Sequence, residues 1–114
     1  MRSLIKLFKA LSDPNRIRIL KMLEVRSLCV CEIAEVLQLA TSTVSKHLSI
    51  LRDAEFILDE KVGKWVNYRL NPSTNERYVS DLLPFIAEWL SDEESVRQDA
   101  EKVRTVDRAK LCAI

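Results

Sequence analysis

The chain has 114 residues, 47% hydrophobic and 31% charged, which suits one compact domain with a modest core. Its single glycine and three prolines exclude a glycine-rich nucleotide loop or a long flexible linker, and its many Leu, Ile, Glu, Lys and Arg residues favour helices. A formal net charge of +1 gives no sign of a nucleic-acid partner by itself. We therefore expect a mainly α fold.

The first two predicted helices meet at Ser12 and Asp13. Apolar residues recur at helical spacing on both sides of this point. Asp13 is a good N-cap and Pro14 suits the first helical position, so the second helix begins there and ends near Glu24. The apolar positions of the two helices are Leu4, Leu7, Phe8, Leu11, Ile17, Leu20 and Leu23.

Two further short helices are predicted over residues 27–37 and 42–54, with Thr41 or Ser42 as the N-cap of the latter. Their lengths and the brief break between them are typical of a helix-turn-helix, whose second helix enters the major groove of DNA. The second helix has an apolar face at i, i+4 and i+7 and a small, hydroxyl-rich face opposite. The apolar face consists of Val44, Leu48 and Leu51.

A β-hairpin is predicted next, because residues 56–59 and 65–70 alternate in the manner of strands and flank Gly63. Lys61 and Lys64 lie at its tip. We therefore expect an α+β fold in which a hairpin follows the helix-turn-helix.

The C-terminal part contains two predicted helices. Ser73 with Glu76, and Ser91 with Glu94, form capping-box patterns that start them. The first helix is strongly apolar on one face, whereas the second is highly charged with a sparse apolar stripe. We predict a domain at residues 1–90 and a charged helical tail at residues 91–114.

The predicted terminal helices carry more apolar surface than one small core can bury. This surplus predicts a twofold homodimer, although packing within the monomer remains an alternative. The residues concerned are Leu4, Leu7, Phe8, Phe85, Ile86 and Trp89.

Candidate DNA contacts lie on the fourth helix and on the hairpin. Small hydroxyl side chains and a lysine suit base edges and phosphates of double-stranded DNA, whereas the bland alternative is an ordinary exposed face. His47 borders the apolar stripe and is either a phosphate or base contact or a packing histidine. The candidate residues are Ser42, Thr43, Ser45, Lys46, His47, Ser49, Lys61, Lys64 and Tyr68.

The cysteines indicate metal or redox chemistry. Their odd count of three, without secretory features, predicts no disulfide framework. No apolar run approaches the roughly 20 residues that span a bilayer. We therefore expect a cytoplasmic protein without a membrane partner.

Cys29 and Cys31 lie where the third helix is predicted to begin. Soft thiolates suit As(III), Sb(III), Cd(II), Pb(II) and Zn(II), and a helix N-terminus lowers a thiol pKa. Positions i and i+2 lie about 200° apart on an ideal helix, so one ion can bind both sulfurs only if the first turn unwinds. Ion binding would then compete with the helix that supports recognition, unless the cysteines are merely small hydrophobic residues.

The sequence resembles the ArsR-type (ArsR/SmtB) winged helix-turn-helix metalloregulatory repressors. The resemblance is carried by residues 11–20, residues 42–54 and the Lys-Val-Gly-Lys hairpin tip at residues 61–64. It covers nearly the whole chain and weakens beyond about Ser91. It implies a homodimer built on the terminal helices, which represses an operon until an inducer binds, with the fourth helix in the major groove and the hairpin wing on the flanking backbone.

Leu28-Cys29-Val30-Cys31 is similar to the arsenic-sensing box of these repressors, which implies As(III) or Sb(III) as the inducer. Another cysteine often follows three positions later in the family, but Ala34 stands there. Cys112 is therefore the remaining candidate for a third thiol ligand, within one subunit or across the dimer. Water or a small-molecule thiol is the alternative donor.

Other functions remain open at this point. A redox- or persulfide-responsive repressor of the same fold would use Cys29, Cys31 or Cys112, and a constitutive DNA-binding protein would have only structural cysteines. A thiol enzyme needs a base and an orienting group, for which a single histidine gives little material. We therefore expect no enzyme and no catalytic cofactor.

Overall fold

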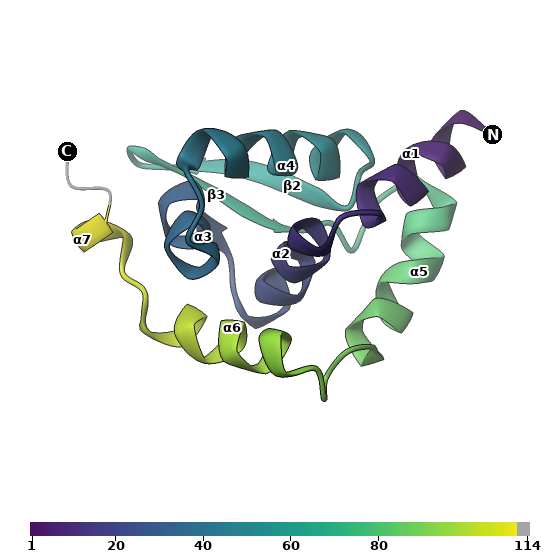
Figure 1. The fold of residues 1–114 in the computed structure, drawn as a ribbon. Coiled ribbons are helices and arrows are strands. Elements are labelled where there is room, and N and C mark those ends of the chain that lie inside the picture. The colour runs from purple at the N-terminus through teal and green to yellow at the C-terminus, as the bar shows by residue number, and fades with distance from the viewer. Residues whose placement is uncertain (112–114) are drawn as a thin grey trace.

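The computed structural model describes residues 1–111 as a mostly helical molecule with a small antiparallel sheet (Figure 1). The elements in chain order are α1 (Arg2–Leu11), α2 (Pro14–Val25), β1 (Leu28–Cys29), α3 (Val30–Leu37), α4 (Thr41–Asp53), β2 (Ile57–Val62), β3 (Trp65–Leu70), α5 (Arg77–Glu88), α6 (Glu94–Thr105) and α7 (Arg108–Leu111). The predicted fold class, mainly α with a β-hairpin, is confirmed. No helix in residues 1–111 has both the length and the apolar character needed to cross a membrane.

Helix α2 lies at the centre of the molecule, between α4 and α6 (Figure 1). Its start is as predicted: the Asp13 carboxylate accepts hydrogen bonds from the backbone N–H groups of Asn15 and Arg16, at 2.8 and 3.2 Å. Five consecutive residues, 19–23, are buried, so the helix is enclosed on most sides. Ile17, predicted to be buried, is only half-buried because it falls outside this enclosed stretch.

The sheet has the strand order β1-β3-β2, with both pairs antiparallel. Gly63 adopts φ 62° in the hairpin turn, a left-handed conformation that glycine adopts without steric cost. Strand β1 was not predicted, because two residues are too few to show an alternating pattern. It takes the place of the expected first turn of the third helix, and its Leu28 pairs with Tyr68 of β3.

Three predicted helix starts are wrong. Ala40 is the N-cap of α4, in place of Thr41 or Ser42, and Glu93 is the N-cap of α6, in place of Ser91. Glu76 is the N-cap of α5, in place of Ser73, and its carboxylate accepts a hydrogen bond from the N–H of Tyr78 at 3.3 Å. A capping-box spacing describes only the local sequence. The residue at which each helix begins also depends on how that helix packs.

Helix α6 packs against α2 and α3 and contributes the fully buried Val103 to the core. The buried Asp99 of α6 accepts two hydrogen bonds from Arg18 of α2, at 2.8 and 2.9 Å. The side-chain hydrogen bond to Asp99 raises the pKa of Arg18 further above its usual value. This two-point ion pair fixes α6 to the central helix.

We expect Asp99→Ala to lower the free energy of unfolding by about 2–4 kcal/mol, because it leaves the half-buried Arg18 guanidinium without its carboxylate partner. Urea unfolding at one fixed protein concentration measures this. Glu94→Ala is the matched control, since it breaks the exposed Glu94–Arg97 pair on the same helix and should change stability little. Equal effects of the two variants would contradict the assigned role of Asp99.

Candidate nucleic-acid interface and thiol site

Helix α4 separates an apolar face from a small polar face, as its sequence predicts. Val44, Leu48 and Leu51 are at most 1% exposed and fix the helix to the core. The predicted contact residues on the exposed face are Ser42, Thr43, Ser45, Lys46 and Ser49. Thr41, which the predicted helix start left outside, is also exposed in the first turn. This face presents hydroxyls and one cation without long side chains that would hinder close approach to a groove.

His47 is half-buried, and its Nδ1 lies 3.2 Å from Nη1 of Arg16. A guanidinium can only donate, so Nδ1 is the acceptor, and the proton of the neutral ring is on Nε2. Arg16 also donates to the carbonyl oxygens of Ala10 and Lys9 at the end of α1, at 2.9 and 3.0 Å. His47 therefore belongs to a polar link between α1, α2 and α4, and Arg16 was not among the predicted site residues.

The β2–β3 hairpin, here called the wing, brings Lys61 and Lys64 to one end of the sheet, and both are exposed. Arg52, at the end of α4, bonds to Asp59 of β2 at 2.9 Å and so connects the polar helix to the wing. Tyr68 lies apart from these lysines. It is half-buried in the middle strand, and burial raises the pKa of its hydroxyl.

Cys29 is the N-cap of α3 and is only 2% exposed. Its sulfur accepts a hydrogen bond from the backbone N–H of Glu32, and Glu32 Oε1 accepts one from the backbone N–H of Cys29 at 2.9 Å. This is a capping box with cysteine in the place that serine or threonine usually takes. The three-position spacing from Cys29 to Glu32 is visible in the sequence and could have revealed it.

The predicted helical geometry of the cysteine pair is wrong. Cys29 has an extended backbone, with φ −91° and ψ 168°, and pairs with Asn67 of β3, whereas Cys31 lies in the first turn of α3 and is half-buried. The two sulfurs therefore do not lie 200° apart on one helix. The Cys29 sulfur instead contacts α3 as part of its N-terminal cap.

The chemical environment of Cys29 also differs from the prediction. A helix N-terminus was expected to lower the pKa of both thiols. Burial dominates and raises the pKa of the Cys29 thiol, although the backbone hydrogen bond from Glu32 acts in the opposite direction. Cys29 is thus a buried thiol that caps a helix.

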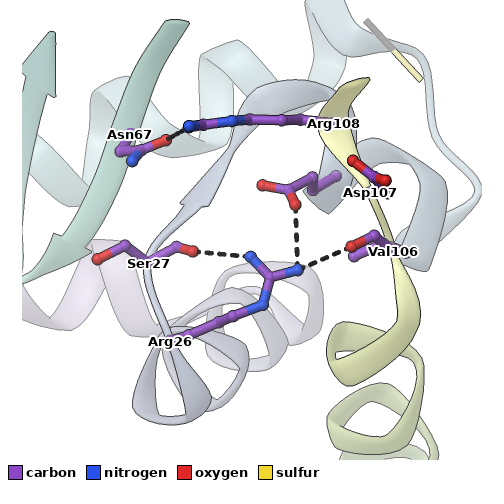
Figure 2. A pocket seen from close by; sticks show the side chains of 7 residues that line it. Arg26, Ser27, Asn67, Val106, Asp107 and Arg108 are labelled. Atoms are coloured by element: carbon purple, nitrogen blue, oxygen red, sulfur yellow. Dashed lines mark hydrogen bonds and ion pairs between the residues drawn. The ribbon is translucent and has the colours of Figure 1, made fainter. Parts of the chain in front are cut away.

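Arg26 holds the C-terminal part of the chain beside this cap (Figure 2). Its Nη2 donates to Glu32 Oε2 at 3.0 Å and to the carbonyl oxygens of Val103 and Val106 at 2.9 and 3.0 Å. Both carboxylate oxygens of the buried Glu32 are thereby engaged. The end of α6 is tied to the carboxylate that completes the Cys29 cap.

The chain after α6 turns back toward α3. Leu111 lines a pocket together with Cys31, Ala34 and Leu39. Cys112, the predicted third ligand, lies outside the described residues. Within residues 1–111, no group of three or more His, Cys, Asp or Glu side chains is arranged to hold a metal ion.

Comparison with known proteins identifies the fold and the family. The profile described as "Bacterial regulatory protein, arsR family" matches residues 13–58, which include the helix-turn-helix. The chain is 38% identical over 105 residues to the arsenical resistance operon repressor of Escherichia coli (strain K12), covering 91% of this chain and 81% of that protein.

Solved structures show the same winged helix-turn-helix. Reduced HlyU from Vibrio cholerae N16961 matches with a TM-score of 0.58 and 28% identity, over 74% of this chain and 88% of that one. The cadmium metal-sensor CMTR from Mycobacterium tuberculosis matches with a TM-score of 0.53 and 36% identity, over 68% and 81%. These proteins are regulators and not enzymes. Together with its polar helix and its wing, these similarities show that the chain belongs to the ArsR family of bacterial regulatory proteins and is a winged helix-turn-helix transcriptional repressor.

Proposed function

We propose that this repressor binds operator DNA as a homodimer and is released by trivalent arsenic or antimony at Cys29 and Cys31, with Cys112 as the third donor. The observation that carries the proposal is that the sulfur of Cys29 caps α3, the helix that packs against α4. Because the proposed partner is operator DNA, we place its action in the cytoplasm.

Ion capture and helix capping use the same sulfur. A sulfur that bonds to arsenic gives up its role as acceptor for the N–H of Glu32, and loss of a side-chain N-cap costs a helix about 0.5–2 kcal/mol. Helix α3 supports α4 in the helix-turn-helix. The inducer therefore favours a conformation in which α4 is less well supported, and DNA favours the other.

The raised thiol pKa is compatible with this chemistry. Arsenite in neutral solution is As(OH)₃, and each As–S bond forms as one hydroxyl leaves with the thiol proton as water. The exchange thus needs no prior release of a proton to solvent. A neutral, buried thiol such as Cys29 can take part in it. Cys31 is disulfide-bonded in this structure, so a small-molecule thiol must first reduce that bond, becoming oxidised itself, before Cys31 can react in this way.

The donor set favours a three-coordinate thiophilic ion over zinc. Structural zinc sites are closed by four ligands, and residues 1–111 offer no cluster of His, Asp or Glu around the two cysteines. The position of Leu111 beside the Cys31 pocket supports Cys112 as a donor, since it is the next residue in the chain. The similarity to an arsenical resistance operon repressor points the same way.

The proposed dimer uses the apolar faces of α1 and α5, which contact each other at one end of the molecule (Figure 1). Phe8, Phe85 and Trp89 are 58%, 56% and 48% exposed there, and the rings of Phe85 and Trp89 stack at 6.3 Å. Large exposed aromatic side chains on two contacting helices are typical of a subunit interface. A twofold dimer would place two α4 helices on successive turns of the operator.

We expect Lys46→Ala to weaken operator binding by about tenfold and to reduce its salt dependence, because it removes an exposed cation from the polar face of α4. Fluorescence anisotropy of labelled upstream DNA at several salt concentrations measures both. Lys102→Ala, which removes an exposed lysine from α6, is the control. Unchanged operator binding by Lys46→Ala would contradict the proposed contact between α4 and DNA.

Cys29→Ser should still bind the operator but require an arsenite concentration more than about a hundredfold higher for release. Serine is a good N-cap and keeps the α3 start, so the variant removes the soft ligand alone. Cys31→Ser should behave likewise, and Cys112→Ser should weaken arsenite binding.

The same titration with antimonite, cadmium and zinc ranks the ions. A mild oxidant followed by a reductant tests thiol oxidation as the signal. Release of Cys29→Ser from the operator at the wild-type arsenite concentration would contradict the proposed sensor.

Phe85→Glu should convert the dimer to a monomer at micromolar concentration, because it places a charge in the proposed apolar interface. Val62→Glu, at a position 40% exposed on the wing, is the control and should leave the dimer intact. Analytical ultracentrifugation distinguishes the two states. A dimeric Phe85→Glu protein would show that the subunits meet elsewhere.

A further inference from the structure

The segment 106–111, here called the strap, leaves the end of α6 and crosses to the sheet. It begins at Val106, the extended C-cap of α6, whose carbonyl oxygen accepts from Arg26. It continues through α7, which packs against α3. Figure 2 shows the start of the strap along one side of a pocket, with the Arg108 side chain reaching across to Asn67 of β3.

Arg108 attaches the strap to the wing. Its Nη1 donates to Oδ1 of Asn67 in β3 at 2.8 Å, and its Cζ lies 4.4 Å from the centroid of the Trp65 ring (Figure 2 shows the first contact). Lys64 Nζ lies 4.9 Å from the centroid of the same ring. Arg108 and Lys64 therefore both make cation–π contacts with one indole at the start of β3. Each of these contacts is favourable by itself.

The indole of Trp65 is held without a polar partner. Its Nε1 is buried and has no hydrogen-bond partner among the described residues. A buried indole N–H without an acceptor is costly, so the ring contacts with Arg108 and Lys64 must offset this cost while the strap is docked.

The strap also reaches the thiol site. Asn67, which accepts from Arg108, is the backbone partner of Cys29 in the β1–β3 pair. At its other end, Leu111 shares a pocket with Cys31. Arg26, which holds the start of the strap, bonds to the Glu32 carboxylate of the Cys29 cap. The strap thus contacts the wing through Arg108 and the cysteine region through its two ends.

We propose that the strap couples ion capture at the thiol site to the wing, with Arg108 as the positioning residue that transmits it. This coupling rests on the proposed arsenite response and describes the part that the wing takes in it. Ion binding beside α3 stabilises the docked strap, and the docked strap holds β3 through Asn67 and Trp65. A wing held in this way cannot adjust to the DNA backbone, so release from the operator involves the wing as well as α4.

The test compares Arg108→Ala with Lys110→Ala in the full-length protein. Lys110 is exposed on the same short helix and carries the same charge, which makes it the matched control. Arsenite binding is followed without DNA by the ultraviolet absorbance of the As–S bonds. Operator affinity is then measured by anisotropy with no arsenite and with saturating arsenite, and amide exchange in β3 is measured in both conditions.

Arg108→Ala should still bind arsenite, but the ratio of operator affinities without and with arsenite should fall by about tenfold relative to wild type. Its β3 amides should exchange faster in arsenite than those of wild type. Lys110→Ala should match wild type in every measurement.

A wild-type affinity ratio in Arg108→Ala would overturn the coupling and leave the arsenite sensor intact. Failure of Arg108→Ala to bind arsenite would also overturn it, because Arg108 would then serve the ion site itself. Failure of the wild-type protein to bind arsenite would overturn the proposed function and the coupling with it.

Discussion

The structure depends on a central buried helix whose basic side chains each hold a different neighbour. From α2, Arg18 bonds to Asp99 of α6, and the buried Lys21 donates to the carbonyl of Ile86 at the end of α5, at 2.8 Å. Arg16 reaches the end of α1 and His47 of α4. These cations donate hydrogen bonds to a carboxylate, to backbone carbonyls at the C-terminal ends of helices and to a ring nitrogen, where positive charge is favourable. Arg16, Arg18 and Lys21 therefore organise the fold.

The second organising feature is the cap of α3. A cysteine is an unusual N-cap, since its sulfur is a weaker acceptor than a hydroxyl oxygen. The same property makes it a good ligand for a soft ion. The cysteine cap is adequate for folding, and a thiophilic ion can replace its hydrogen bond. It therefore suits the proposed switch, because a small free-energy change at Cys29 acts on α3, which packs against α4.

The wing and the C-terminal segment extend this arrangement. Cys29 belongs to the same sheet as the wing, and Arg108 bonds to the residue that pairs with it. A sensor on α3 alone would act on the recognition helix only. The sheet register and the strap connect the proposed ion site to both elements that are proposed to contact DNA, and the exposed aromatic residues of α1 and α5 are proposed to contact a second subunit.

The sequence by itself determined the periodic features: the helical stripes, the Asp13 cap, the alternating hairpin around Gly63, and the exposed polar face of α4. These follow from local spacing, which reports backbone geometry directly. It also singled out the two cysteines, since their sulfur atoms are evident from residue type alone. Tertiary structure alone decided that Cys29 is an extended, buried cap, that α6 packs into the core, and that Arg108 meets the wing. Strand β1, the Arg16–His47 link and the Arg108–Asn67 bond join residues far apart in the chain, and no local pattern encodes such contacts, because they form only once the core has brought the elements together.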